Sequence, residues 1–268
     1  MFSTFAACYL YLLKVQPKKH LGQHFLKNEA IAQDIAQSLL YRLPYKKVLE
    51  IGAGMGVLTK YLLEDQRFET WVVEIDSESI LYLQAHYLPI TSRLLEQDFL
   101  WMDLQKFSPE PFAIIGNFPY NISSQILFKA LENKNVVCEV VGMFQKEVAQ
   151  RIASPPGSRE YGILSVLLQA FYDIEYLFTV NENEFNPPPK VKSGVIRLVR
   201  NATETLACDE AKFKLVVKTG FNQRRKTLRN ALQSLVNEKS ILSDEIYSKR
   251  AEQLSVADFV WITQQLFA

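Results

Sequence analysis

Short apolar runs alternate with amphipathic segments from Val48 to Val199. This alternation is typical of an α/β fold, in which helices cover a mainly parallel sheet. No helical segment separates the last two apolar runs, so we expect them to form an antiparallel pair at the sheet edge. The expected strands are Val48–Ile51, Thr70–Ile75, Arg93–Gln97, Phe112–Gly116, Val136–Phe144, Phe171–Val180 and Val195–Val199. The expected helices include Gly56–Leu63, Ser77–Ala85 and Ser123–Glu132.

The pattern changes after Arg200, where residues 201–268 show no strand period and indicate several short helices. We therefore predict a sheet-containing domain at 14–200 and a small all-α domain at 201–268. Residues 1–13 are apolar and precede the first basic run, which is the reverse of a signal peptide, and they are too short to span a bilayer. We interpret them as a non-essential extension, with a weak membrane-associating tail as the alternative.

The charge balance and the cysteines argue against a strongly basic nucleic-acid-binding protein, a disulfide-rich protein and a zinc protein. The formal net charge is only +1, so contact with a nucleic acid must depend on local basic patches. Cys8, Cys138 and Cys208 are odd in number and far apart, which suits neither a disulfide framework nor a zinc site. These features favour a cytoplasmic protein without a structural metal.

A glycine-rich turn, Gly52-Ala53-Gly54-Met55-Gly56, follows the first expected strand and precedes a helix. Glycines there let a ligand approach the main chain, and the helix N-terminus favours an anionic group. The turn alone is a weak signal, but Val57 replaces the last glycine of the nicotinamide fingerprint. Glu50, just before it, favours a methyltransferase.

Two acidic residues end the next strands. Glu74 lies 22 positions after Gly52, where a carboxylate can accept the hydroxyl protons of a ribose, and Asp98 can accept from an adenine amino group. Either acid alone would more often be a solvated residue. At successive strand ends they predict a nucleoside pocket.

The segment Asn117-Phe118-Pro119-Tyr120 follows the fourth expected strand. The Asn117 side-chain oxygen and the Pro119 carbonyl can accept the two hydrogens of an adenine amino group and localise its lone pair for attack. Tyr120 offers a ring on which the base can stack. Phe185, in a loop stiffened by Pro187–Pro189, is either the second stacking wall for a flipped base or a core residue.

Two segments are basic and contain no acidic residue. Lys14–Lys27 holds four lysines, and Lys212–Asn237 holds seven basic residues. We expect the second to include an arginine-rich helix over Phe221–Asn230. Such clusters neutralise phosphates, although a solvated helix face explains them about equally well.

Taken in order, these motifs resemble the small-subunit ribosomal RNA adenine dimethyltransferases of the KsgA family over nearly the whole chain. The resemblance also includes Lys19-His20-Leu21-Gly22-Gln23-His24-Phe25-Leu26. It implies a Rossmann-like class I methyltransferase sheet and S-adenosylmethionine as methyl donor. The implied cofactor contacts are His24, Leu26, Gly52, Gly54, Glu74, Asp98 and Asn117. The implied catalytic residues are Asn117, Pro119, Tyr120 and Phe185. The implied RNA-binding residues are Arg224, Arg225, Lys226 and Arg229.

Position 24 departs from the family, which usually has asparagine there, although a neutral imidazole can still donate or accept a hydrogen bond. The resemblance implies as substrate a pair of adjacent adenosines in a hairpin loop near the 3′ end of small-subunit rRNA, within a partly assembled 30S particle. Each adenosine would become N6,N6-dimethyladenosine. The enzyme would act as a monomer and would not bind a membrane.

Three alternatives stay open. A large-subunit rRNA methyltransferase of the macrolide-resistance type shares the catalytic motifs, although the Phe185 loop and the Arg224–Arg229 segment fit the small-subunit enzymes better. A DNA adenine methyltransferase would need a separate target-recognition domain. A non-catalytic assembly factor would not need Glu74, Asp98, Asn117 and Tyr120 to be intact.

Overall fold

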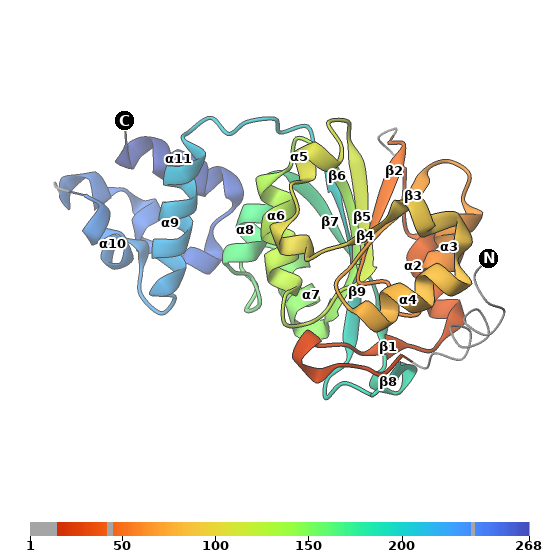
Figure 1. The fold of residues 1–268 in the computed structure, drawn as a ribbon. Coiled ribbons are helices and arrows are strands. Elements are labelled where there is room, and N and C mark those ends of the chain that lie inside the picture. Colours follow the sequence, from red (N-terminus) through yellow and green to blue (C-terminus); the bar gives the residue numbers. More distant parts are fainter. Residues whose placement is uncertain (1–14, 42–44, 237–238, 268) are drawn as a thin grey trace. The chain divides into compact units, whose positions relative to one another are not determined.

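A seven-stranded sheet forms the centre of the larger part of the molecule (Figure 1). The computed structural model describes residues 15–41, 45–236 and 239–267, so the predicted extension at 1–13 lies outside the described residues. In spatial order the strands are β4 (Leu94–Glu96), β3 (Glu69–Glu74), β2 (Lys47–Ile51), β5 (Phe112–Asn117), β6 (Val137–Gln145), β9 (Ser193–Arg200) and β7 (Tyr172–Val180).

Burial explains this order. β5 and β6 are buried along almost their whole length, as expected of central strands covered on both faces. β4 has three residues and β7 is partly exposed, which suits the two edges. The strands from β4 to β6 are parallel and β9 is antiparallel to β6, which confirms the predicted α/β class. All seven expected strands are present within two residues of their predicted bounds.

Helices cover both faces of the sheet, with α2, α3 and α4 on one side and α6 on the other (Figure 1). The α2 helix begins after Asn28, whose side chain accepts from the amides of Ala30 and Ile31. A second sheet of two strands pairs β1 with β8. The elements of this part are η1 (Lys19–Leu21), β1 (Phe25–Leu26), α2 (Glu29–Gln37), α3 (Thr59–Glu64), α4 (Ser77–His86), η2 (Leu88–Arg93), η3 (Phe99–Trp101), α5 (Leu104–Phe107), α6 (Ser123–Glu132), η4 (Glu182–Glu184) and β8 (Phe185–Asn186).

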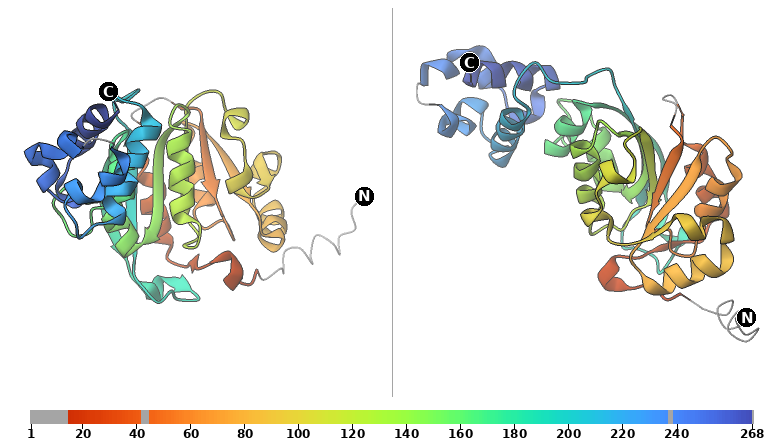
Figure 2. Two further views of the ribbon diagram at one scale, coloured as in Figure 1. Left: turned by 90° about the vertical axis from the view of Figure 1, so that its left-hand side faces the viewer. Right: turned by 45° about the horizontal axis from the view of Figure 1, so that its top comes forward.

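The chain divides into two compact units, residues 1–149 with 175–199 (unit 1) and residues 150–174 with 200–268 (unit 2). Among its described residues, the C-terminal part of unit 2 has helices and no strand, as predicted (Figure 2). Its elements are α9 (Glu210–Asn222), α10 (Leu228–Ala231), η5 (Gln233–Leu235), η6 (Lys239–Ser243), η7 (Glu245–Ser248), η8 (Ala251–Gln253) and α11 (Val256–Leu266).

Residues 150–174 lie in unit 2, although their sequence pattern groups them with the sheet. They include the end of α7 (Lys146–Ala153) and α8 (Ile163–Gln169), which contacts α9 and α11. The Tyr161 ring lies 6.1 Å from that of Phe221, and the Gly157 amide donates to the Glu252 carbonyl. The apolar face of α8 therefore completes the core of the helical unit.

Candidate active site

A cavity of about 230 Å³ lies in unit 1 at the carboxyl ends of the parallel strands. Connections after successive parallel strands meet at this edge, which is where open α/β sheets bind ligands. The cavity is lined by Leu21, Gly22, Gln23, His24, Phe25, Ile51, Gly52, Gly54, Val73, Glu74, Ile75, Gln97, Asp98, Phe99, Asn117, Phe118, Pro119, Tyr120, Asn121 and Ile122. The structure thus brings together the predicted strand-end residues.

The glycine turn after β2 forms one wall. Gly54 has a φ of +55°, and a Cβ atom there would lie 2.8 Å from Cε1 of Phe25. Glycine is needed both for this conformation and for the close approach of the Phe25 ring. The Gly54 amide donates to Oε2 of Glu74 over 3.0 Å, which ties the turn to the end of β3.

Glu74 is buried and held by three main-chain amides. Its Oε1 accepts from Ile75 and Asp76, and its Oε2 from Gly54. Burial raises the pKa of Glu74, and the three amide hydrogen bonds counteract part of this rise. Because Oε1 already has two donors, Oε2 keeps the acceptor capacity for a hydroxyl group in the cavity.

Glu50 lies behind this wall and is fully buried. Its Oε2 accepts from the Thr59 hydroxyl over 2.6 Å, so it joins β2 to the first turn of α3. Burial raises the pKa of Glu50 to about 8; the Thr59 hydrogen bond lowers it and the Glu74 charge raises it further. Glu50 does not line the cavity and instead holds the glycine turn between its two neighbouring elements.

Asp98, after β4, caps η3 by accepting from the Leu100 amide over 2.8 Å. Asn117 ends β5, and its Nδ2 donates to the His24 carbonyl over 2.9 Å. The amide Oδ1 of Asn117 is therefore left to accept from another donor. The Pro119 carbonyl accepts from the Ile122 amide at 3.2 Å and keeps one further lone pair.

Two aromatic rings face each other in the cavity. Tyr120 is fixed by a 2.5 Å hydrogen bond between its hydroxyl and Oγ of Ser193, and burial raises the pKa of Tyr120. The His24 imidazole stacks on Tyr120 with centroids 5.4 Å apart, and its Nδ1 donates to the Pro187 carbonyl over 2.8 Å. Histidine at position 24 thus contacts the residue that is predicted to stack on the base.

Phe185 and Leu26 lie away from the cavity, contrary to their expected positions. They pair across β1 and β8, are 1% and 4% exposed, and belong to the core beneath α2. Burying an aromatic ring of this size removes a large apolar area from water, which favours the core over the cavity rim. Phe185 therefore does not form the second stacking wall in this structure, where His24 occupies the face of Tyr120.

The expected helix over Phe221–Asn230 is wrong, because α9 ends at Asn222 and α10 begins at Leu228. The chain turns between them, which lets Leu228 pack against Gly220. Arg224 donates to the Arg159 carbonyl and lies 3.9 Å from the Glu252 carboxylate. The other three predicted RNA contacts differ. Arg229 donates to the Leu242 and Ser243 carbonyls, whereas the side chains of Arg225 and Lys226 are exposed, without a partner among the described residues.

Several cavity residues were missed in the sequence, notably Gln97, Phe99 and Asn121. Each adjoins a predicted residue, so proximity to the motif was the available signal. Within the described ranges, no group of three or more His, Cys, Asp or Glu side chains could hold a metal ion. No described helix is long and apolar enough to cross a membrane.

Comparisons with known proteins agree with this geometry. The profile of a family described as "Ribosomal RNA adenine dimethylase" matches residues 14–266. "Ribosomal RNA small subunit methyltransferase A" of Cytophaga hutchinsonii is 59% identical over 254 residues, covering 94% of this chain and 98% of that protein. The protein of the same name from Flavobacterium johnsoniae is 56% identical over 256 residues, covering 95% and 97%.

Two solved structures are also similar. A dimethyladenosine transferase from Plasmodium falciparum matches with a TM-score of 0.73 and 26% identity, covering 89% of this chain and 96% of that one. The 23S rRNA methyltransferase ErmE matches with a TM-score of 0.65 and 25% identity, covering 90% and 99%.

Proposed function

Because the chain belongs to the ribosomal RNA adenine dimethylase family, we propose that it dimethylates N6 of two adjacent adenosines in small-subunit rRNA. The targets lie in the hairpin loop near the 3′ end of 16S rRNA, and S-adenosylmethionine is the methyl donor. The curated relatives at 51–59% identity carry small-subunit names, which favours this substrate over the large-subunit rRNA of ErmE.

One observation carries the proposal: the Asn117–Tyr120 motif shares a cavity with Glu74, Asp98 and the glycine turn. This shared cavity supports a nucleoside-binding wall and an amino-binding motif within reach of each other. That arrangement is what methyl transfer to an adenine amino group requires, since proximity and orientation supply much of the rate.

The residues present fit the cofactor. Oε2 of Glu74 accepts from a ribose hydroxyl, Asp98 accepts from an adenine amino group, and the glycine turn lets the ligand lie against the main chain. S-adenosylmethionine supplies an activated methyl group on a sulfonium. The protein therefore needs to bind, orient and desolvate, and no residue has to serve as a strong base.

The target adenine is held by its amino group and by one ring face. Oδ1 of Asn117 and the Pro119 carbonyl accept the two amino hydrogens, which draws the nitrogen lone pair out of conjugation and aims it at the methyl group. Tyr120 supplies the stacking surface, and its bond to Ser193 fixes the plane of the ring. The His24 ring must move off the face of Tyr120 before a base can stack there.

Arg225 and Lys226 are exposed, and we assign them to contacts with rRNA phosphates. Stacking of one adenine is worth only about 1–3 kcal/mol and tolerates any sequence, so target choice depends on the shape of a folded RNA. We infer that this shape is presented in a partly assembled 30S particle in the cytoplasm, where the protein acts as a monomer and contributes to small-subunit biogenesis.

The test is to incubate the purified protein and S-adenosylmethionine with small subunits from cells that lack this modification. Digestion and mass spectrometry should show two dimethyladenosines in the 3′ hairpin. Modification of 23S rRNA alone would support the large-subunit alternative. Binding of the particle without any methylation would indicate a non-catalytic assembly factor.

A further inference from the structure

The segment Gln16–His24, here called the strap, leads into β1 (Figure 1). Leu21, Gly22, Gln23 and His24 from the strap line the cavity. The strap lies close to the opposite wall, since a Cβ atom on Gly22 would be 2.6 Å from Oδ1 of Asn121. A small shift of the strap would therefore change the shape of the site.

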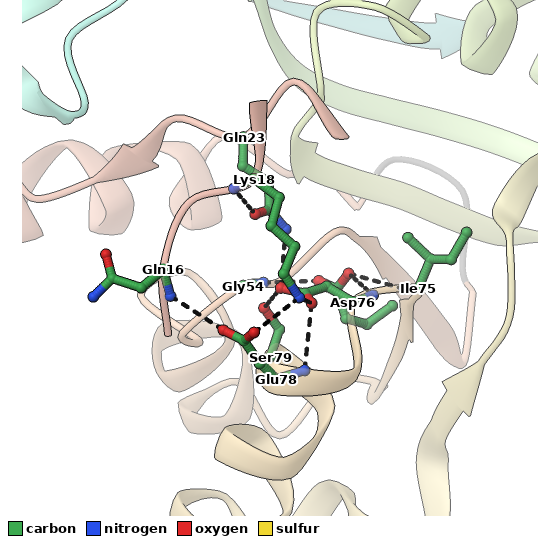
Figure 3. Close-up of polar contacts among 9 residues, drawn as sticks. Gln16, Lys18, Gln23, Gly54, Ile75, Asp76, Glu78 and Ser79 are labelled. Atoms are coloured by element: carbon green, nitrogen blue, oxygen red, sulfur yellow. Dashed lines mark hydrogen bonds and ion pairs between the residues drawn. The ribbon is translucent and has the colours of Figure 1, made fainter. Parts of the chain in front are cut away.

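Asp76 anchors the strap, as Figure 3 shows. Its buried carboxylate accepts from Nζ of Lys18 and from Nε2 of Gln23, at 3.3 Å. On its own side it accepts from the Ser79 hydroxyl at 2.9 Å and from the Glu78 amide at the start of α4. One carboxylate thus joins the strap, the end of β3 and a helix N-terminus.

Further contacts hold Lys18 in place beside Asp76. Nζ of Lys18 also lies 3.2 Å from Oε1 of Glu78, and the Lys18 amide donates to Oε1 of Gln23. Burial would raise the pKa of Asp76, but hydrogen bonds from Lys18, Ser79 and Gln23 outweigh burial and hold that pKa below its ordinary value. The Lys18 charge is therefore paired with two carboxylates at a partly buried position, whereas Lys19 is exposed.

The anchor connects to the two ends of the reaction site. The Asp76 amide donates to Oε1 of Glu74, so the residue that accepts Lys18 also orients the proposed ribose acceptor. At the other end of the strap, the His24 carbonyl accepts from Nδ2 of Asn117. This bond determines which face of the Asn117 amide is turned toward the cavity.

We propose that Lys18 and Asp76 are positioning residues for methyl transfer: their ion pair holds the strap against the cavity and so fixes the Asn117 amide through the His24 carbonyl. The proposal rests on the proposed function for the identity of the ligands. It assigns Lys18 to the cofactor site, although the sequence groups it with a basic segment suited to RNA.

The test compares Lys18→Met with Lys19→Met, which removes the same charge from the neighbouring exposed position. S-adenosylmethionine binding is measured by calorimetry without RNA, and kcat and KM are measured on small subunits. Lys18→Met should weaken cofactor binding about three- to tenfold, the range for a partly buried ion pair, and should lower kcat at saturating cofactor. Lys19→Met should leave cofactor affinity unchanged.

A second set of variants separates positioning from folding. Lys18→Arg keeps the charge and should recover most of the affinity, while Asp76→Asn keeps the side-chain volume and should resemble Lys18→Met. The double variant Lys18→Met/Asp76→Asn should be no worse than the poorer single one, because both remove the same interaction. Thermal unfolding of each variant monitors the fold.

The outcomes are distinct. If Lys18→Met binds the cofactor like wild type, or if it and Lys19→Met lose only RNA affinity to the same extent, the positioning role is overturned. Additive losses in the double variant would also overturn it. Failure of the wild-type protein to methylate rRNA would instead overturn the proposed function, while the cofactor titrations would still judge the strap.

Discussion

The cavity of unit 1 and the basic turn of unit 2 differ in how their proposed functional side chains are held. Glu74 accepts hydrogen bonds from three main-chain amides and Asn117 donates one to a main-chain carbonyl, so both are fixed before any ligand binds. Arg225 and Lys226 are exposed and have no side-chain partner among the described residues.

The difference teaches that the way a side chain is held reflects its proposed task, which is chemistry in the cavity and phosphate binding in the basic turn. Chemistry on one atom needs pre-organised groups, because small displacements cost rate. Phosphate attraction acts over a Debye length of about 10 Å at 0.1 M salt and tolerates mobile side chains. Each of the following experiments tests one side of this contrast.

The largest effect is expected at Asn117. Asn117→Ala should abolish methyl transfer, because it removes the Oδ1 atom that we propose as acceptor for the amino group. Thermal unfolding should change little, since the variant loses one hydrogen bond to the His24 carbonyl. Radiolabel transfer to small subunits measures the activity, and turnover near wild type would contradict the assigned role.

Glu74 tests the cofactor side of the same cavity. Glu74→Ala should weaken S-adenosylmethionine binding by about 1.5–3 kcal/mol, the range for a hydrogen bond to a charged group. Calorimetric titration measures this effect, with Lys19→Met as a control that keeps the cavity. Unchanged affinity in Glu74→Ala would exclude Glu74 as the ribose acceptor.

The basic turn should respond to salt instead. Arg225→Ala/Lys226→Ala should weaken rRNA binding and reduce the slope of log affinity against log salt by about 0.7–0.9 for each lost phosphate contact. Arg224→Ala should mainly lower the unfolding temperature, because Arg224 donates to the Arg159 carbonyl near Glu252. Filter binding over a salt series measures these slopes. Equal slopes for all variants would contradict the assignment of Arg225 and Lys226 to RNA binding and of Arg224 to stability.

Glu50 predicts a pH effect confined to unit 1. Its folded pKa is about 8, above the ordinary value of 4.5, so the folded state binds more protons between these values. Its contribution to stability is therefore lost as pH rises from about 4.5 to 8. Glu50→Gln should flatten the decline of the unfolding temperature over this window by several degrees, as measured by calorimetry without ligand. An unchanged pH profile would contradict the buried, protonated carboxyl.

The smallest effect is expected from deleting residues 1–13. Methylation and solubility should stay unchanged, since Lys18 is the first side chain anchored at the cavity among the described residues, which begin at Val15. A large loss of activity on small subunits would show that the extension contributes to the cavity or to RNA binding.

Much of unit 1 could be predicted because its signals are local. Apolar runs located all seven strands, and the rule that parallel strands end at one edge brought the glycine turn, Glu74, Asp98 and the Asn117–Tyr120 motif together. The helical pattern after Arg200 was equally local. The basic segment was less predictable, because charge alone does not distinguish Arg224, which has internal partners, from Arg225, which has none among the described residues.

The sequence by itself determined the fold class, the place of the site and the family, since periodicity and short motifs are properties of neighbouring residues. Only the tertiary structure decided the pairings between distant segments. It buried Phe185 beside Leu26, brought His24 onto Tyr120, and joined Lys18 to Asp76 across 58 positions. These contacts depend on where the folded chain crosses itself, and burial and charge pairing then select among side chains that look alike in sequence.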